Sequence, residues 1–178
     1  TNVTLSRPAC LGDGAGGLAR LCYDLSALDP HKKTVYYSTL PLSKQADEFS
    51  YEEFNPSALI GLPRVEGREA LLTGIGDLSC SESVNRLIHE LRSYKPTVVT
   101  CDAEHNNRPN NTKWIIHNLI LIFKEVEVPL IFKAYAFPRT AIRWVLTTLV
   151  QNQILPEVLI TPFSPEKSSE IFIYLKKG

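Results

Sequence analysis

A glycine-rich loop near the N-terminus constrains the fold of this chain more than any other feature. Residues 12–17 read Gly-Asp-Gly-Ala-Gly-Gly and directly follow a short apolar segment, residues 3–11. From residue 18 to residue 28, leucines and a cysteine recur at three- and four-residue steps, which predicts an amphipathic helix. A strand, a glycine turn and a helix in this order predict a βαβ unit whose loop and helix N-terminus can receive a ligand.

The rest of the chain continues this alternation. Further strands are predicted at residues 34–37, 70–73, 97–101, 129–133, 158–160 and 171–174. Further helices are predicted to begin at a capping box formed by Ser79 and Glu82, at about Thr112, and at Pro138. Only a short Pro- and Ser-rich link joins the last two strands, so they should pair antiparallel. The sequence therefore predicts a Rossmann-like α/β fold with a mostly parallel sheet, an antiparallel last strand and helices on both faces.

Length and composition fit one domain that spans residues 1–178. Lys and Arg together number 19, as do Asp and Glu, so the formal net charge is zero. Proteins that bind RNA mainly through phosphates are usually basic, so RNA affinity is expected to be local or supplied by other domains. No apolar run is long enough for a membrane span, so no membrane is expected as a partner. The four widely spaced cysteines are expected to be free thiols in the core, with no metal site.

The glycine loop alone does not select a cofactor, because nicotinamide enzymes and methyltransferases share it. A dinucleotide site requires an acidic residue at the end of the second strand, where this chain has Ser38 and Thr39. An NAD-dependent oxidoreductase is therefore a less favoured alternative. Asp13 would repel a pyrophosphate but suits the ammonium and sulfonium of S-adenosylmethionine; the alternative is that Asp13 caps the helix. We therefore expect S-adenosylmethionine as the cofactor and S-adenosylhomocysteine as its product.

The predicted cofactor site combines the loop with the ends of neighbouring strands. Asp77, just past the third strand, is expected to accept a hydrogen bond from the adenine amino group, with Leu78 beside the ring. A turn-forming role for Asp77 is the alternative. The complete set of predicted cofactor residues is Gly12, Asp13, Gly14, Ala15, Gly16, Gly17, Ser38, Asp77, Leu78 and Asp102.

Three charged residues stand at the ends of otherwise apolar strands. Asp102 and Lys133 end the predicted fourth and fifth strands, and Glu170 opens the last one. Ligands of open α/β sheets bind outside the carboxyl ends of the parallel strands, and an antiparallel last strand begins at that same edge. Asp102, Lys133 and Glu170 are therefore predicted to meet there as the catalytic residues.

These residues carry a resemblance to a known family. The glycine loop, Asp102, Lys133 within Phe-Lys-Ala-Tyr and Glu170 within Ser-Ser-Glu-Ile-Phe resemble the Lys-Asp-Lys-Glu methyltransferase domain of mononegavirus large (L) polymerase proteins, closest to rhabdoviruses. The resemblance implies a viral mRNA cap methyltransferase. Its substrates would be the ribose 2′-hydroxyl of the first transcribed nucleotide and also guanine N7 of the cap.

The resemblance also implies what surrounds the domain. The first Lys of the family's tetrad lies on a helix upstream of the glycine loop, and a basic segment follows the domain, so the chain is expected to be excised from a larger polymerase protein. The implied partners are the capped 5′ end of viral mRNA, the other L domains and, through them, the viral phosphoprotein. The implied locations are the host cytoplasm and the virion. A non-catalytic or degenerate nucleotide- or RNA-binding module is a further alternative.

The chemistry assigns roles to the three charged residues. Lys133 is predicted to deprotonate or polarise the 2′-hydroxyl, with Asp102 and Glu170 positioning its amine. A base acting near neutral pH must have its pKa lowered about three units from the usual value for Lys, which corresponds to roughly 4 kcal/mol. Weaker candidates for RNA contact are His105, Arg139 and Arg143. Trp114 and Trp144 lie near apolar helix faces and are predicted to be core residues.

Overall fold

A computed structural model of the protein describes residues 4–14, 16–39, 57–67, 76–103, 109–136, 138–160 and 170–177, with backbone only at 109–111. Within these residues, seven strands form one sheet in the order β3-β2-β1-β4-β5-β7-β6. β7 runs antiparallel to both of its neighbours, and the other pairs are parallel. The predicted architecture is therefore confirmed: a Rossmann-like, mostly parallel sheet with an antiparallel last strand in the chain.

The elements alternate along the chain as the sequence pattern indicates. The strands are β1 (Pro8–Leu11), β2 (Val35–Ser38), β3 (Val65–Glu66), β4 (Val98–Cys101), β5 (Leu130–Tyr135), β6 (Pro156–Leu159) and β7 (Glu170–Leu175). The helices are α1 (Gly17–Leu25), the short 3₁₀ helix η2 (Ser57–Leu59), α3 (Ser81–Tyr94), α4 (Pro109–Val126) and α5 (Arg139–Gln151).

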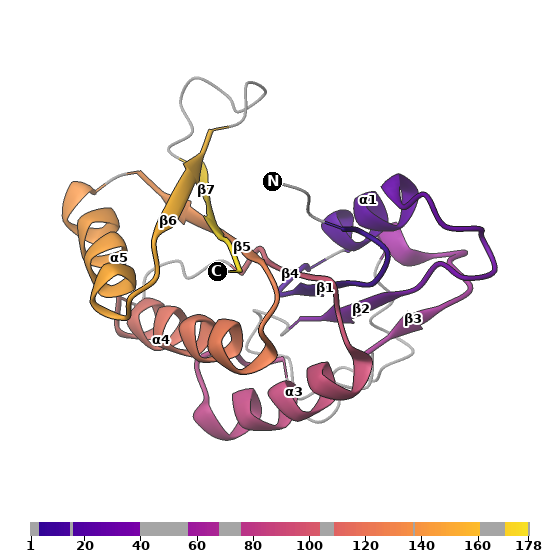
Figure 1. The fold of residues 1–178 in the computed structure, drawn as a ribbon, viewed down its shortest axis with the longest axis horizontal. Coiled ribbons are helices and arrows are strands. Elements are labelled where there is room, and N and C mark those ends of the chain that lie inside the picture. The colour runs from indigo at the N-terminus through magenta and orange to yellow at the C-terminus, as the bar shows by residue number, and fades with distance from the viewer. Residues whose placement is uncertain are drawn as a thin grey trace.

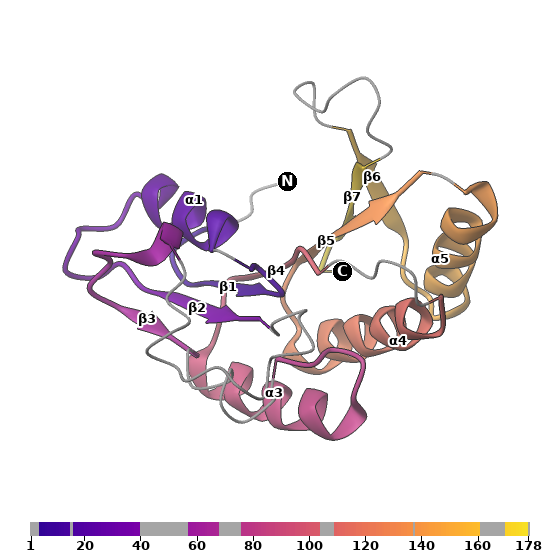
Figure 2. The same ribbon diagram turned by 180° about the vertical axis from the view of Figure 1, so that it is seen from behind.

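Helices cover the two faces of the sheet unequally. Figures 1 and 2 show α1 on one side and α3 and α4 on the other, where α5 also packs. The larger core lies between the sheet and α3, α4 and α5, and it includes Phe132, Leu87 and Ile122. A smaller core lies under α1 and includes Cys10, Cys22 and Tyr37. Both faces of β1, β2 and β4 are therefore buried, which explains their continuous apolar sequences.

One prediction of a helix start is wrong. The capping box does not form: α3 begins at Ser81 with Cys80 as its N-cap and no side-chain cap, because the Ser79 hydroxyl donates to Asp77 instead. The predicted amphipathic helix forms as α1, although Leu21 is 51% exposed and Leu25 is 62% exposed. Only Ala19, Cys22 and Tyr23 of this helix reach the core.

The third strand and the cysteines complete the comparison with the sequence. The strand that pairs with β2 is Val65–Glu66, and the strand predicted at residues 70–73 lies outside the described residues. All four cysteines are free thiols, and Cys10, Cys22 and Cys101 are buried as predicted. Among the described residues, no helix is both long enough and apolar enough to cross a membrane.

Candidate active site

The glycine loop lies between the ends of β1 and β4. Gly12 has a φ of +60°, and a Cβ built on it would lie 2.8 Å from Cβ of Ala103, so the loop passes directly over the residues that follow β4. The Asp102 backbone N–H donates to the Leu11 carbonyl at 3.1 Å, which fixes the same junction. Gly14 has a φ of +50°, and no atom of the described residues lies within 4 Å of the place where its Cβ would stand. As far as the described residues go, the loop is therefore tight against the sheet at Gly12 and leaves room for a ligand at Gly14.

Asp13 caps the helix that follows the loop. Its two carboxylate oxygens accept the backbone N–H groups of Leu18, at 3.1 Å, and Ala19, at 2.7 Å. These are orphan donors of the first turn of α1, so the structure matches the capping alternative. Contact between Asp13 and a cofactor stays a prediction. Burial raises the pKa of Asp13 from 3.8 to about 6, and the hydrogen bonds from Ala19 and Leu18 oppose that shift.

The raised pKa of Asp13 predicts a pH-dependent stability. The folded state holds this proton up to about pH 6, whereas the unfolded state releases it near pH 3.8, so the fold loses stability as pH rises between those values. The shift corresponds to about 3 kcal/mol. Asp13→Asn keeps a carbonyl oxygen to accept from α1 and cannot ionise, so the variant should lack this loss. Urea unfolding of both proteins at pH 4 and pH 6.5 measures the difference. If the two proteins lose the same unfolding free energy between these pH values, the assignment to Asp13 is wrong.

Polar groups gather where β2 ends beside the loop. The Gly14 N–H donates to Thr39 Oγ1 at 3.1 Å, and the Tyr37 hydroxyl donates to the Gly14 carbonyl. Gly76 packs so closely here that a Cβ would lie 2.3 Å from the Thr39 carbonyl oxygen. The Ser38 hydroxyl is buried in this corner, and within the part of the chain that the structure describes its oxygen has no hydrogen-bond partner. Such an orphaned hydroxyl at a strand end is a ready group for a ligand.

The turn after Gly76 forms the outer wall of this corner. Asp77 Oδ1 accepts from the backbone N–H of Ser79 at 3.0 Å and from its hydroxyl at 2.6 Å, which is the turn-forming role left as the alternative. Asp77 is half-buried and directly follows Gly76, which packs against Ser38 and Thr39. Leu78 is buried in the main core, and Asn118 donates to its carbonyl at 2.7 Å. Leu78 therefore supports the turn from the core side.

Lys133 and Asp102 form an ion pair at the same edge of the sheet. Lys133 Nζ lies 3.0 Å from Asp102 Oδ1, and the Lys133 side chain is 4% exposed whereas that of Asp102 is 33% exposed. Adjacent parallel strands β4 and β5 place the two residues at neighbouring carboxyl ends, as the sequence predicts. Burying an ammonium group is costly, so a buried Lys that a carboxylate holds at a sheet edge is a candidate catalytic residue.

Glu170 lies on the same face of the sheet as Lys133. In the β5–β7 pairing, Lys133 is opposite Phe172 and Tyr135 is opposite Glu170. Directly opposed residues share a face, and side chains two apart on one strand share it too. Glu170 and Lys133 are therefore diagonal neighbours, and the Lys133 amine lies 6.0 Å from the centre of the Tyr135 ring. The register places Glu170 beside the ion pair, as the sequence predicts.

Asp102 joins the two halves of the site. It follows the strand on which the glycine loop rests, and its side chain holds Lys133. A ligand lying over Gly14 and Ser38 would thus end near the Lys133 amine. Thr39 and Tyr37, which hold the Gly14 peptide, were missed in the sequence, although polar side chains beside a glycine loop at a strand end are a usable signal.

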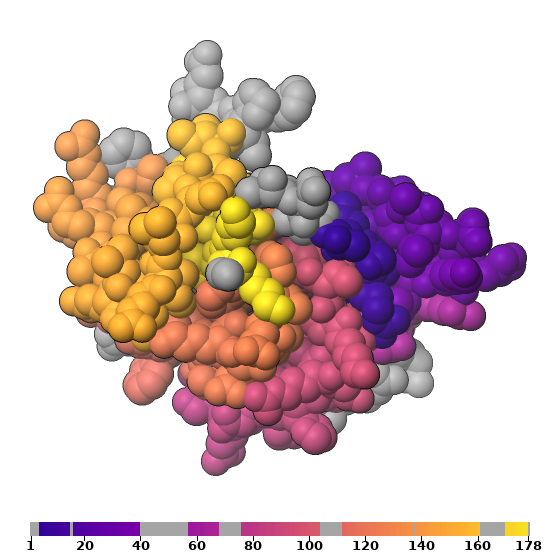
Figure 3. Space-filling view, in the orientation of Figure 1, coloured from indigo at the N-terminus to yellow at the C-terminus, as the bar shows by residue number. Residues whose placement is uncertain are grey.

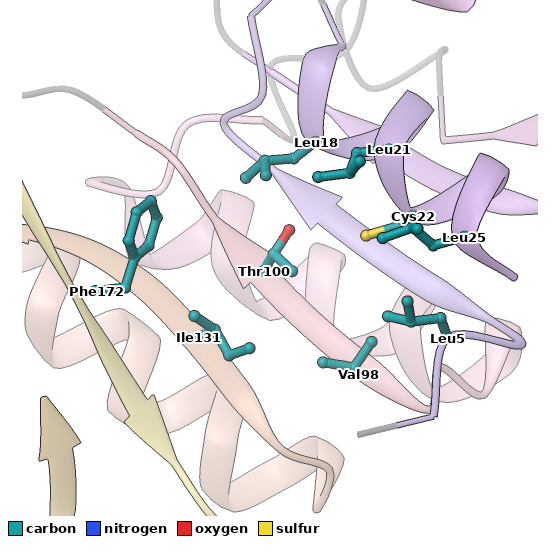
Figure 4. A pocket seen from close by; sticks show the side chains of 9 residues that line it. All are labelled: Leu5, Leu18, Leu21, Cys22, Leu25, Val98, Thr100, Ile131 and Phe172. Atoms are coloured by element: carbon teal, nitrogen blue, oxygen red, sulfur yellow. The ribbon is translucent and has the colours of Figure 1, made fainter. Parts of the chain in front are cut away.

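An apolar pocket of about 230 Å³ opens below this edge, on the face of the sheet that carries α1. Figure 4 shows its walls: leucines of α1 on one side, and on the other Val98 and Thr100 of β4 with Ile131 and Phe172. Ile131 and Phe172 share the sheet face of Lys133 because of their register. The lining of the pocket is almost wholly apolar, so it lacks the polar side chains that would bind a charged substrate.

The remaining predicted site residues belong to the RNA-contact set and the glycine loop. Arg139 and Arg143 are exposed in the first turns of α5, and His105 and Ala15 lie outside the described residues. Trp114 was predicted to be a core residue and is 55% exposed, so that prediction is wrong. Within the described ranges, no group of three or more His, Cys, Asp or Glu side chains is arranged to hold a metal ion.

Comparison with known proteins identifies the fold. No family model matches the chain, and no curated protein matches it. The chain is similar to the solved structure of an rRNA methylase from Streptococcus thermophilus, with a TM-score of 0.52 and 16% identity over 97% of this chain and 86% of that one. It is also similar to a proposed rRNA methylase from Clostridium thermocellum, with a TM-score of 0.50 and 10% identity over 98% and 87% of the two chains. These likenesses show a Rossmann-like methyltransferase fold.

Proposed function

We propose that this domain is an S-adenosylmethionine-dependent methyltransferase acting on the capped 5′ end of viral mRNA. Its primary acceptor is the ribose 2′-oxygen of the first nucleotide, and guanine N7 is a second acceptor. The observation that carries the proposal is the buried Lys133–Asp102 pair at the sheet edge where the glycine loop ends. The fold and the similarity of the motif residues to L-protein methyltransferases support it. The rRNA methylases with this fold favour RNA as the substrate class.

The residues beside the loop fit this cofactor. The open space at Gly14 admits a ligand close to the backbone, and the orphaned Ser38 hydroxyl can pair with a ribose hydroxyl. The Asp77 carboxylate beside it can accept from the adenine amino group while Oδ1 keeps its turn contacts. The absence of an acidic side chain at Ser38 and Thr39 removes the usual ribose partner of NAD.

The chain's own part in the reaction is positioning and proton transfer. S-adenosylmethionine, when bound, supplies a methyl group already activated on a sulfonium. In its neutral form, the Lys133 amine would hold the 2′-hydroxyl in line with that methyl group and take the hydroxyl proton as the new O–C bond forms and the S–C bond breaks. Asp102 fixes the amine by its 3.0 Å contact, and Glu170 borders it from β7. Guanine N7 carries no proton, so its methylation does not need Lys133 as a base.

The proposed setting follows from the same resemblance. The domain would act within an L polymerase protein, next to the other L domains and, through them, the phosphoprotein. It would work in the host cytoplasm and in the virion. These partners and locations rest on the motif resemblance alone, and the cofactor test below does not depend on them.

Calorimetric titration with S-adenosylmethionine, S-adenosylhomocysteine and NAD tests the cofactor. Both adenosyl ligands should bind with one site per chain, and NAD should not. Asp77→Ala should weaken S-adenosylmethionine binding by about tenfold, the value of one hydrogen bond to a charged group. Asp77→Asn keeps an oxygen acceptor for the turn and removes the negative charge, so it tests the role of the carboxylate alone. Asp24→Ala removes an exposed Asp on α1, and this variant should bind S-adenosylmethionine as the wild type does. Binding of NAD without either adenosyl ligand would overturn the proposal.

A further inference from the structure

The charge of this neutral chain is unevenly distributed. Residues 106–156 contain six Lys and Arg residues but only two acidic residues, Glu125 and Glu127, which gives this segment a net charge of +4. The remainder of the chain carries the compensating charge of −4. The segment includes α4 and α5, and from residue 128 to residue 156 it has no acidic side chain. Four of the six cations lie on the two helices: Lys113 and Lys124 on α4, and Arg139 and Arg143 on α5.

Aromatic side chains lie among these cations. Trp114 of α4 is 55% exposed, which is unusual for so large an apolar side chain. The ring of Trp144, on α5, meets His117 edge to face at a centroid distance of 5.6 Å, and the Lys113 amine lies 5.7 Å from its centre. The α4–α5 patch is defined here by the residues of this surface: Lys113, Trp114, His117, Arg139, Arg143 and Trp144.

The patch lies near the catalytic edge. α4 follows β4 and α5 follows β5, so the N-terminal ends of both helices adjoin the carboxyl ends that carry Asp102 and Lys133. Lys113, Trp114, Arg139 and Arg143 belong to the first two turns of their helices, within about 8 Å of each helix start along its axis. In the space-filling view of Figure 3 the orange surfaces of α4 and α5 adjoin one another.

We propose that the α4–α5 patch binds the single-stranded RNA that follows the nucleotide to be methylated. Exposed aromatic rings stack on bases of any sequence, and interleaved Lys and Arg side chains contact the phosphates. Trp114 is the stacking residue, and Lys113 and Arg143 are the phosphate contacts. This inference rests on the proposed function for its substrate, and it explains how a chain of zero net charge can still hold RNA locally.

Fluorescence anisotropy with a 3′-labelled single-stranded RNA decamer tests the patch. Trp114→Ala should weaken RNA binding by about tenfold, and Trp114→Phe should restore most of it, because stacking needs only a flat ring. Lys113→Ala combined with Arg143→Ala should weaken binding and reduce the slope of log affinity against log salt concentration by about 1.4, since each phosphate contact to a single strand contributes about 0.7. Lys32→Ala combined with Lys176→Ala removes the same charge from exposed positions outside the patch and should leave binding almost unchanged.

Two readouts separate this inference from the proposed function. S-adenosylmethionine titration of every variant should match the wild type, which shows that the fold and cofactor site are intact. If the wild type methylates RNA and the patch variants do so with unchanged KM, the patch inference fails and the function stands. If the patch variants lose RNA affinity but the wild type never transfers a methyl group, the patch stands and the function fails. Absence of RNA binding by the wild type, or equal loss in the charge-matched control, overturns the inference.

Discussion

Lys133→Ala is expected to lower methyl transfer to the ribose 2′-oxygen by at least about 100-fold, the range of one general acid–base group. The amine lies 3.0 Å from Asp102 Oδ1, and the substitution removes the group to which the proposal assigns the hydroxyl proton. Binding of S-adenosylmethionine should stay within a few-fold of the wild type, because the loop, Ser38 and Asp77 lie on the other side of Asp102. A cap assay that separates 2′-O from N7 products measures both transfers in one experiment.

Two companion variants and a second product make the result interpretable. Lys133→Arg keeps the charge but cannot release a proton near neutral pH, so it should also fail in 2′-O transfer. Lys124→Ala removes an exposed Lys whose contact is Asn152, and it should transfer methyl as the wild type does. Guanine N7 methylation should survive Lys133→Ala better than 2′-O methylation does. Retention of full 2′-O transfer by Lys133→Ala, measured in a chain whose wild type is active, would remove Lys133 from the reaction.

The sequence predicted the arrangement of the sheet because burial leaves few alternatives. A continuous apolar run such as residues 98–101 predicts a strand that is buried on both faces of the sheet. When helices connect such strands, neighbouring strands run parallel. The same rule brings together charges that end such strands, and for this reason Asp102 and Lys133 could be paired from the sequence. Their 3.0 Å contact is the strongest success of the sequence-based prediction. Cofactor contacts of the predicted residues stay predictions.

Local details depended on partners that periodicity does not reveal. Ser79 and Glu82 have the spacing of a capping box, but the Ser79 hydroxyl lies nearer to Asp77 and bonds there. The stripe of leucines on α1 shows that one face is apolar, yet it does not show which part of that face meets the sheet. Trp114 follows the helical apolar spacing in the sequence and still projects outward. The Ser79 contact depends on a turn whose geometry the pattern does not encode, and the exposures of the α1 leucines and Trp114 depend on how each helix is placed against the sheet.

Gly12→Ala is expected to destabilise the fold by about 3 kcal/mol and to abolish binding of S-adenosylmethionine. An L residue with a φ of +60° is strained by about 1 to 2 kcal/mol. The added methyl group would also lie 2.8 Å from Ala103 Cβ and 3.0 Å from its Cα, so backbone must move at the junction of the loop and β4. That movement would displace Asp102 as well, because its N–H is bonded to Leu11 next to the loop.

Gly17→Ala provides the matched control within the same loop. Gly17 is the first residue of α1, its φ is ordinary, and within the described residues a Cβ there meets no atom within 4 Å beyond its chain neighbours and its own helix backbone. Ala is a better helix residue than Gly, so urea unfolding should show unchanged or slightly higher stability for Gly17→Ala. Equal stability of the Gly12→Ala variant and the wild type would show that the loop does not press against β4. If Gly17→Ala folds well but loses S-adenosylmethionine affinity, the ligand lies against this first turn of α1, where the described residues leave room for the added methyl group.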